Sequence, residues 1–547
     1  MKKIIICLGI ALTTFSSCSD FIDEDVRSSV PADSNYKTAA GFQYLVNSTY
    51  ARLKTVYGGE PWLFCSGTDM YAEGRDPEPA GLSRYLQLIP TSSNVDYLYT
   101  QCYRAIQSAN KTIYYSGITE QTSSIPVLVG EAKFIRALNY FLLVQTYGGV
   151  PIVDYNISEA VMSFDRNSDE EVYAFIIKDL QESLAAVGTG SYAATGKVNK
   201  RAVQDLLAKV HLTRGYETFG TAADFTTAAT YADAAIAGQA LNVAWAQLFL
   251  PANDLNAEVI FSVQFDKNST STSPTTLGNN QFYYFSSYLG GSETKGGAPL
   301  RAYRLCPTGY ALGLFEKDDK RWTATFMNEV YENYYDFFRV ADKTNLKIKH
   351  FYEPKWFTPT DKANYLATNA GKLATGFTYH PWGEYSAEYT LTKNIDYQTI
   401  PVKKFDDPDP LTPSSTGPVS TRDFIVSRLA ETYLVAAEAY LKAGNPDTGL
   451  ARLNEVRRRA GVANATLAQF NIDYILDERG RELLGEYHRW FDLKRTGTLI
   501  ARASQHNYNV KEANFNGTNG AKKILRPIPQ SAIDLNQNKN FPQNPGY

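Results

Sequence analysis

The sequence predicts a mainly α protein in which about four helix pairs stack into a superhelix. This body is expected to hold a large, irregular, loop-rich insertion that carries a few short strands. Apolar and small residues recur at three- and four-residue steps in paired segments, which is typical of packed helices. The middle of the chain lacks that period. At 547 residues the chain exceeds the usual single-domain size, and the paired segments favour a repeat-built body over separate domains.

The clearest helix pair lies within residues 422–461. Small residues let two helices approach closely, aromatic residues fill the space between them, and Asn445 with Pro446 indicates the turn. The spacing is close to that of a tetratricopeptide repeat. The residues that carry it are Tyr433, Ala436, Ala437, Tyr440, Gly444, Gly449, Leu453 and Val456.

Three earlier segments repeat this plan with longer insertions between the helices. Apolar faces pair residues 42–50 with 95–110, residues 134–142 with 172–184, and residues 202–212 with 225–236. Ser168 and Glu171 form a predicted capping box at the start of one helix. Four such pairs predict a tetratricopeptide-like right-handed superhelix.

Residues 240–421 form a different region, rich in Gly, Ser, Thr, Asn, Tyr and Trp, with one strand candidate at residues 259–265. A long irregular stretch of this kind is usually functional or disordered, and its aromatic content argues against disorder. We therefore expect a loop-rich binding region there and in the insertion at residues 57–94. The full division is residues 1–17, 18–35, 36–239 (helical repeats), 240–421 and 422–547 (last repeat and C-terminal region).

The first 17 residues have the layout of a cleaved secretory signal: Lys2 and Lys3, an apolar run, then small residues. Residues 15–18 look like a lipobox, with Phe15 at the usual Leu position, so Cys18 is predicted to be acylated, for example with palmitate, and to anchor the chain. An acidic tether follows over residues 18–35. Loss of the two leader lysines moves the formal net charge from -3 to -5, so no nucleic-acid partner is expected.

The segment 477–497 predicts one continuous amphipathic helix. Its buried stripe contains Leu476, Leu483, Leu484, Tyr487, Trp490, Phe491 and Leu493, and its other faces are expected to be a solvated, charged surface. That surface carries Glu478, Arg481, Glu482, Glu486, Arg489, Asp492 and Arg495. Gly480 and Gly485 would weaken the helix, which indicates that another backbone packs close by.

This segment, together with residues 526–536 and 543–547, resembles the C-terminal signature of the SusD/RagB family. The resemblance implies an outer-membrane lipoprotein that binds nutrients beside a SusC-like TonB-dependent transporter. The acidic tether is similar to the export signal that sends such lipoproteins to the cell exterior. In glycan-binding members, loops from the two regions 57–94 and 240–421 generally form the site.

Catalytic and metal motifs are not found in the sequence. The five histidines show no HExxH pattern, and the glycine-rich residues 290–297 lack the order of a phosphate-binding loop. No cofactor is expected. Asp406, Asp407 and Asp409 could contribute to a structural calcium site, although a solvated turn is the favoured interpretation. Cys65, Cys102 and Cys306 are an odd, widely spaced set that predicts no disulfide framework.

Two clusters of aromatic and polar residues are the candidate ligand-binding site, because sugars pack C–H faces on rings and need polar partners for their hydroxyls. The first contains Trp62, Asp69, Tyr71, Glu73, Arg75, Arg84 and Tyr85, with Asn94 just beyond. The second contains Tyr283, Tyr284, Tyr288, Arg301, Tyr303 and Trp322. A lower-ranked third platform contains Trp356, Tyr379, Trp382 and Tyr385.

The predicted function is capture of an oligosaccharide or polysaccharide at the cell surface and its delivery to the transporter, for which the protein acts as a lid without catalysis. One alternative keeps the transporter and changes the cargo to peptides. Another is a helical-repeat scaffold that binds only proteins. A further alternative is a hydrolase with Asp69 and Glu73 as its acid and base.

Overall fold

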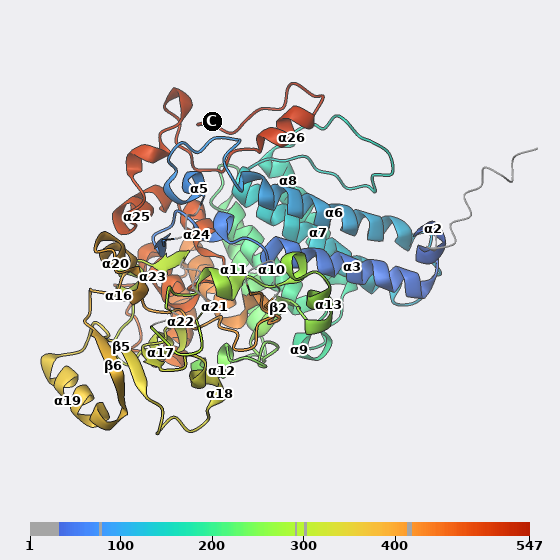
Figure 1. The fold of residues 1–547 in the computed structure, drawn as a ribbon. Helices are drawn as coiled ribbons and strands as arrows, with labels where there is room; N and C mark the ends of the chain where they lie inside the picture. Colours follow the sequence, from blue (N-terminus) through green and yellow to red (C-terminus); the bar gives the residue numbers. More distant parts are fainter. Residues whose placement is uncertain (1–31, 76–78, 290–292, 300–303, 413–417) are drawn as a thin grey trace, which may run out of the picture.

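Four stacked helix pairs form the body of the protein (Figure 1). The computed structural model describes residues 32–75, 79–289, 293–299, 304–412 and 418–547. Within each pair the helices pack together, and α6 on α7, α8 on α10 and α11 on α21 join successive pairs. The pairs are α3 (Ala39–Tyr57) with α6 (Val95–Ser116), α7 (Ile125–Tyr147) with α8 (Asp169–Ala186), α10 (Lys200–Arg214) with α11 (Ala222–Ile236), and α21 (Leu429–Lys442) with α22 (Pro446–Ala460). The predicted helical-repeat superhelix is confirmed.

Local sequence signals set the ends and the spacing of these helices. Ser168 caps α8 in the predicted capping box with Glu171. Asn445 precedes α22, and Pro446 occupies its first position, where a missing N–H costs nothing. Ala-rich faces let α11 and α21 pack closely, because alanine leaves room for the opposing backbone.

Short elements make up most of the remaining chain. In Figure 1 the sheet with α19 lies at the lower left, away from the helical pairs. The shorter helices are α2 (Ala32–Tyr36), α4 (Trp62–Cys65), α5 (Ala80–Arg84), α9 (Tyr192–Thr195), α12 (Trp245–Leu248), α13 (Lys267–Thr272), α14 (Pro274–Leu277), α15 (Gln281–Tyr284), α16 (Gly309–Gly313), α17 (Lys320–Thr325), α18 (Asp336–Arg339), α19 (Pro359–Asn369), α20 (Ala387–Thr392), α25 (Leu499–His506) and α26 (Gln530–Leu535).

The described residues form three small sheets, two of which join the loop-rich region to other parts of the chain. The predicted strand is present as β2 (Val259–Val263), which pairs antiparallel with β7 (Phe424–Arg428) directly before α21. β1 (Tyr71–Glu73) pairs with β3 (Leu305–Pro307), and β5 (Ile348–Tyr352) lies between β4 (Glu329–Tyr331) and β6 (Leu373–His380). β1, β3 and β4 span three residues each, and β6 is partly exposed and interrupted by Gly376, so none of these four gives a clear alternating pattern.

The continuous helix predicted over residues 477–497 is wrong. The chain forms α23 (Ile472–Glu482), a turn, and then α24 (Arg489–Arg495). Gly485 and Tyr487 have φ angles of 80° and 65° in the turn, which an α-helix excludes. The expected close approach of another backbone at the two glycines is also wrong, because side chains pack there: a Cβ on Gly480 would lie 2.8 Å from Leu314, and one on Gly485 would lie 2.2 Å from Phe405.

The expectation of a solvated charged face on this segment is also wrong, because all seven charged side chains are buried. Five of the seven have ionic partners outside the segment, whereas Arg481 and Asp492 pair with charges on α23 and α24, and this pairing makes burial tolerable. Glu478 accepts hydrogen bonds from Arg321 at 2.6 Å and Arg457 at 2.8 Å. Glu486 accepts from Lys404 at 2.6 Å and from Arg428 at 2.7 Å. The segment therefore serves as an internal ionic hub that joins the loop-rich region to the last helix pair.

The predicted leader, Cys18 and most of the acidic tether fall within residues 1–31, outside the described residues. In the part of the chain that the structure describes, no helix combines the length and the apolar character needed to cross a membrane.

Candidate functional site

The two predicted binding regions meet at the β1–β3 ribbon. Tyr71 lies opposite Pro307 and Glu73 opposite Leu305, so Gly74 after β1 and Arg304 before β3 lie side by side. The backbone N–H of Gly74 donates to the carbonyl of Arg304 at 3.0 Å. Residues that are more than 200 positions apart therefore share one edge of the molecule.

Five of the predicted site residues do not offer a surface to a ligand, which corrects the expectation for them. Trp62, Asp69, Tyr71, Tyr85 and Trp322 are all buried. The Tyr85 ring packs 3.9 Å from the Phe515 ring, and its hydroxyl accepts from Trp490 Nε1 at 3.1 Å. These side chains fill the junction between the loops and the signature segment, as large aromatic residues in cores commonly do.

Arg75, Tyr288 and Asp396 form the first partly exposed group at this edge. Arg75 Nη1 donates to the Tyr288 hydroxyl at 3.1 Å and to Asp396 at 3.2 Å, and its guanidinium carbon lies 5.1 Å from the centre of the Tyr288 ring. The Arg75 side chain is 55% exposed, whereas that of Asp396 is 6% exposed. A buried carboxylate thus holds an exposed guanidinium beside a half-buried ring.

Tyr283, Tyr284 and Arg304 form the second group. Both rings are half-buried, and the Arg304 guanidinium carbon lies 5.9 Å from the centre of each ring. The Tyr284 ring contacts buried Trp62 edge to face at 5.0 Å. Burial raises the pKa of Tyr284 to about 12, so its hydroxyl remains a hydrogen-bond donor at neutral pH. Arg301 and Tyr303 lie outside the described residues.

Glu60 and Asn94 complete this second group. Asn94 Nδ2 donates to the Glu60 carboxylate. Burial raises the pKa of Glu60, although Asn94 and Arg304 oppose that shift. Together the two groups combine rings, a carboxylate, an amide and guanidinium donors, which is the mixture that a carbohydrate requires. Sequence reasoning missed Glu60, Arg304 and Asp396: the first two flank predicted aromatic residues, whereas nothing near Asp396 indicates the site.

The other predicted polar residues have structural partners. Arg84 Nε donates to Glu73 at 2.6 Å, and Ser83 also donates to that carboxylate. Asp69 is held between Arg489 and Arg502. Because both carboxylates are already engaged by cations, the geometry does not favour Asp69 and Glu73 as a catalytic acid and base.

The third aromatic platform packs largely on itself and on the core. The Tyr385 ring is buried and its hydroxyl donates to the Glu353 carbonyl at 2.6 Å, while Tyr379 donates to the Glu353 carboxylate at 2.6 Å. Trp356 and Trp382 are half-buried and lie 5.7 Å from Trp322 and 5.9 Å from Tyr385, respectively.

The carboxylates considered for calcium have other partners. Asp406 accepts from the Tyr334 hydroxyl at 2.6 Å, Asp407 from Ser420 at 2.6 Å, and Asp409 pairs with Arg339 at 2.9 Å. Asp406 and Asp407 are buried, so the expected solvated turn is wrong for those two. Among the described residues no group of three or more His, Cys, Asp or Glu could hold a metal ion. Cys65, Cys102 and Cys306 are buried, and none of the three forms a disulfide within the described residues.

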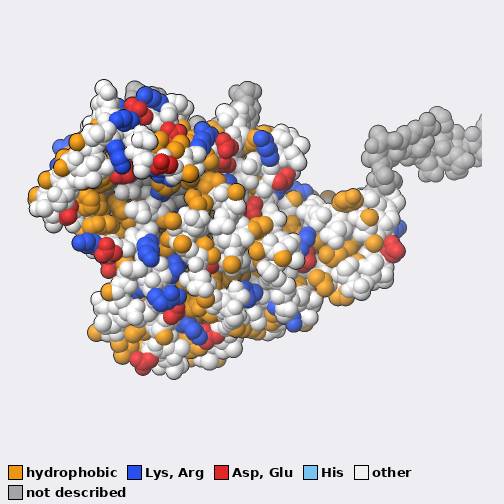
Figure 2. Space-filling view, turned by 90° about the horizontal axis from the view of Figure 1, so that it is seen from below, with side chains coloured by type: hydrophobic (Ala, Val, Ile, Leu, Met, Phe, Trp, Pro, Cys, Tyr) orange, Lys and Arg blue, Asp and Glu red, His pale blue; other side chains and the backbone are white. Residues whose placement is uncertain are grey.

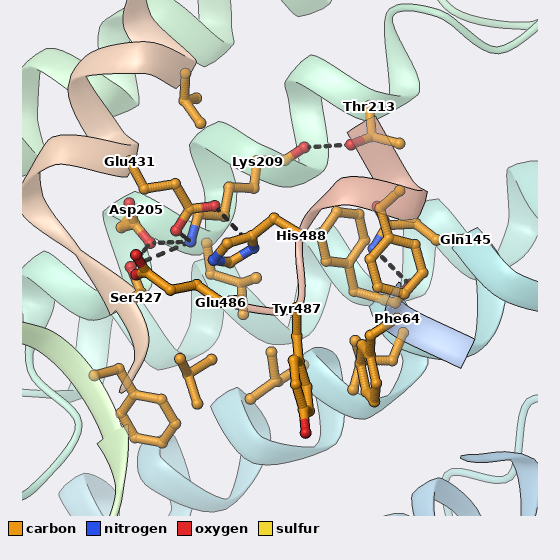
Figure 3. A pocket seen from close by; sticks show the side chains of 18 of the residues that line it. Phe64, Gln145, Asp205, Lys209, Thr213, Ser427, Glu431, Glu486, Tyr487 and His488 are labelled. Atoms are coloured by element: carbon orange, nitrogen blue, oxygen red, sulfur yellow. Dashed lines mark hydrogen bonds and ion pairs between the residues drawn. The ribbon is translucent and has the colours of Figure 1, made fainter. Parts of the chain in front are cut away.

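A small cavity of about 80 Å³, lined mainly by apolar side chains with a cluster of charged ones, lies in the interior between α10, α21 and the turn that precedes α24 (Figure 3). Lys209 Nζ contacts Glu431 at 2.5 Å, Asp205 at 3.0 Å and Ser427 at 3.2 Å. His488 points to Glu431, 3.4 Å away, and burial lowers the pKa of His488. Ligand sites usually measure about 300–1,000 Å³, so this cavity is too small for a sugar.

Comparison with known proteins gives consistent matches along the chain. A family model described as the SusD family matches residues 257–547, and one described as "Starch-binding associating with outer membrane" matches residues 20–212. The SusD-like protein P2 of Formosa agariphila is 25% identical, with 100% of both chains covered. The starch-binding protein SusD of Bacteroides thetaiotaomicron is 25% identical over 84% of this chain and 79% of its own. A solved laminarin-binding SusD-like protein has a TM-score of 0.69 at 22% identity, covering 94% of this chain and 100% of that one.

Proposed function

Because this chain belongs to the SusD family, we propose that it is an outer-membrane lipoprotein that captures a glycan and delivers it to a SusC-like TonB-dependent transporter, as its lid. It binds without catalysis. Glycan binding is supported by the two groups of residues at the β1–β3 edge, in which guanidinium groups lie against half-buried rings. Arg75 lies against Tyr288, and Arg304 lies against Tyr283 and Tyr284. The names of relatives that bind starch and laminarin support glucans as the first ligands to test.

A sugar bound at this edge would use the two groups differently. The half-buried tyrosine rings would pack against C–H groups of the sugar, and the guanidinium and amide groups would donate hydrogen bonds to its hydroxyls. Asp396 and Glu60 would accept from hydroxyls or orient those donors. Because no bond is broken, the affinity comes from many modest contacts along a polymer.

A calorimetric panel tests the cargo class. Maltooligosaccharides, laminarioligosaccharides and unrelated peptides of similar length would each be titrated into the full chain in detergent. We expect heat of binding from at least one glycan and none from the peptides. If only the peptides bound, the proposed cargo would be a peptide and not a glycan.

The transporter partner is supported by an apolar surface near the start of the described chain. Two adjoining grooves of about 840 and 450 Å³ share residues of α6, of the segment 151–164 and of α26. The rim is unusually apolar: Leu535 is 76% exposed and Met162 50% exposed. Large exposed apolar patches commonly mark protein interfaces.

This surface also lies within reach of the anchor. Tyr36 of α2 lines the larger groove, and α2 begins 14 residues after Cys18. A chain of that length spans at most about 50 Å, which keeps the groove near the membrane that would hold the transporter. Purification from outer membranes in mild detergent should bring a TonB-dependent barrel with the protein, and Leu535→Asp should reduce its yield. Co-purification of envelope assembly factors without a barrel would instead favour the scaffold alternative.

A further inference from the structure

A second pocket, of about 530 Å³, lies away from the β1–β3 edge, between α12, α17, α18 and the segment around Lys403. Its volume is within the range of small-molecule sites. On the face seen from below, Lys and Arg side chains gather beside hydrophobic ones over the part of the molecule that these helices occupy (Figure 2). The walls are largely aromatic and come from Trp245, Phe249, Tyr331, Phe337 and Phe338.

The lining is cationic. Lys320, Lys403, Lys404 and Arg459 line the pocket against one carboxylate, that of Glu329. Lys404 pairs with Glu486 at 2.6 Å, and Arg459 pairs with Glu258 at 2.9 Å, so both of these cations already have a carboxylate partner in the protein. Glu329 accepts from the Tyr365 hydroxyl at 2.8 Å.

Lys403 differs from its neighbours because its ammonium group has no hydrogen bond and no ion pair among the described residues. The residue is only 7% exposed, and Nζ lies 3.5 Å from the centre of the Phe337 ring. Burial lowers the pKa of Lys403 to about 7, although Asp406 opposes that shift. A ring face compensates a buried ammonium only in part, since the three N–H donors still lack acceptors.

The indole of Trp245 adds a second unused donor. Its Nε1 is buried and has no hydrogen-bond partner among the described residues, and the guanidinium groups of Arg459 and Arg428 lie 4.7 and 5.3 Å from the ring. Native proteins rarely leave such donors unpaired. An unpartnered ammonium group in a positively charged, ring-lined pocket matches a ligand that brings acceptor oxygens, a negative charge and a flat body.

We propose that this pocket binds a small carboxylate carried on a ring, with the carboxylate on Lys403 and the ring against Phe337 and the neighbouring aromatic walls. Two sources have this chemistry: a uronic acid, which presents a C–H face, and an aromatic acid, which presents a π face. The site is separate from the glycan edge and does not depend on the function proposed there.

Titration of the full chain with two matched pairs of probes tests the proposal: glucuronate against glucose, and benzoate against benzyl alcohol. We expect at least one acid to bind at millimolar concentration and about tenfold or more tighter than its neutral partner, as charge-assisted hydrogen bonds imply. If only glucuronate bound, the ligand would be a uronic acid. If only benzoate bound, the ligand would be an aromatic acid.

Lys403→Met should abolish the preference for the acid and leave glycan binding at the β1–β3 edge unchanged. The control is Lys178→Met, on the exposed side of α8, which should bind like the natural chain. As a second measurement, the bound acid should slow labelling of Lys403 by an amine-reactive reagent, as quantified by mass spectrometry. Equal binding of acid and neutral probes, undiminished acid binding by Lys403→Met, or the failure of both acids to bind would each overturn the proposal.

Discussion

Arg489 and Asp69 form a two-point ion pair in the interior, with Nε 2.7 Å from Oδ1 and Nη2 2.6 Å from Oδ2. Arg502 adds a third hydrogen bond to the same carboxylate at 3.1 Å. Burial alone would raise the pKa of Asp69, but the two guanidinium groups hold it below its usual value. The pair connects the C-terminal signature segment directly to the loop that precedes β1, so it positions one side of the candidate glycan site.

Replacement of Asp69 by Asn should therefore destabilise the protein. Breaking a buried ion pair by removing one partner costs about 3–5 kcal/mol, because the remaining charge is left buried. The measurement is the free energy of unfolding in urea. Asp473→Asn is the matched control: its carboxylate also pairs with Arg502, at 2.8 Å, but is 75% exposed, so we expect a loss of about 1 kcal/mol or less. Equal losses for the two variants would contradict this account.

The helical repeats could be predicted because their small and apolar residues act locally, at spacings visible in one segment. The charged residues of the signature segment were misplaced for the opposite reason. Charge on a helix face is usually solvated, but Glu478 pairs with Arg321 and Glu486 with Lys404 and Arg428, and these partners lie at least 58 positions away. No periodicity within the segment carries that information.

The site was predictable to the level of regions and not of side chains. The predicted regions 57–94 and 240–421 do meet where β1 pairs with β3, yet a tyrosine that fills a junction, such as Tyr85, has the same local sequence signal as a half-buried one, such as Tyr288. Asp396, which holds Arg75, belongs to neither predicted cluster. Only the three-dimensional packing separates these roles.

Acid should weaken the fold through the buried ionic hub. Burial alone would raise the pKa of Glu478 and Glu486, but their cationic neighbours hold both low, that of Glu486 at about 2. A folded-state pKa below the unfolded value of about 4.3 stabilises the fold above that pH, and this contribution is lost as the pH falls toward about 2. Burial raises the pKa of Asp406 to about 7, so this residue has the opposite effect: its contribution to the free energy of unfolding increases as the pH falls from about 7 to about 4.

We therefore expect the free energy of unfolding to drop steeply between about pH 4.5 and pH 3. For each carboxylate the drop is about 1.4 kcal/mol for every pH unit below the unfolded-state pKa, until the folded-state pKa is reached. Urea titrations at a series of pH values would measure it. Glu170→Gln, at an exposed position in the first turn of α8, is the control and should leave the profile unchanged. A flat profile over this interval would be incompatible with the ionic hub.

Gly485 should resist substitution more strongly than another glycine with the same backbone angle. Both Gly485 and Gly444 have φ of 80°, where a side chain costs about 1–2 kcal/mol. A Cβ on Gly485 would also lie 2.2 Å from Phe405, whereas one on Gly444 would meet nothing within 4 Å. Gly485→Ala should therefore cost about 1–3 kcal/mol more than Gly444→Ala in the free energy of unfolding. Equal losses in the free energy of unfolding would show that Phe405 moves aside without destabilising the protein, which would contradict this prediction.

Arg75→Ala and Tyr288→Ala should weaken glycan binding without unfolding the protein. The Arg75 side chain is 55% exposed and the Tyr288 ring half-buried, so their removal leaves no large cavity. Loss of one ring face or of the guanidinium donors should cost about 1 kcal/mol each, or roughly fivefold in affinity. Calorimetry with the glycan that binds the natural chain measures this, and melting temperatures check the fold. Tyr44→Ala is the control, because that tyrosine is 67% exposed on α3 and belongs to neither group of the site. If Tyr288→Ala bound as tightly as Tyr44→Ala, the β1–β3 edge would lose its assignment as the glycan site.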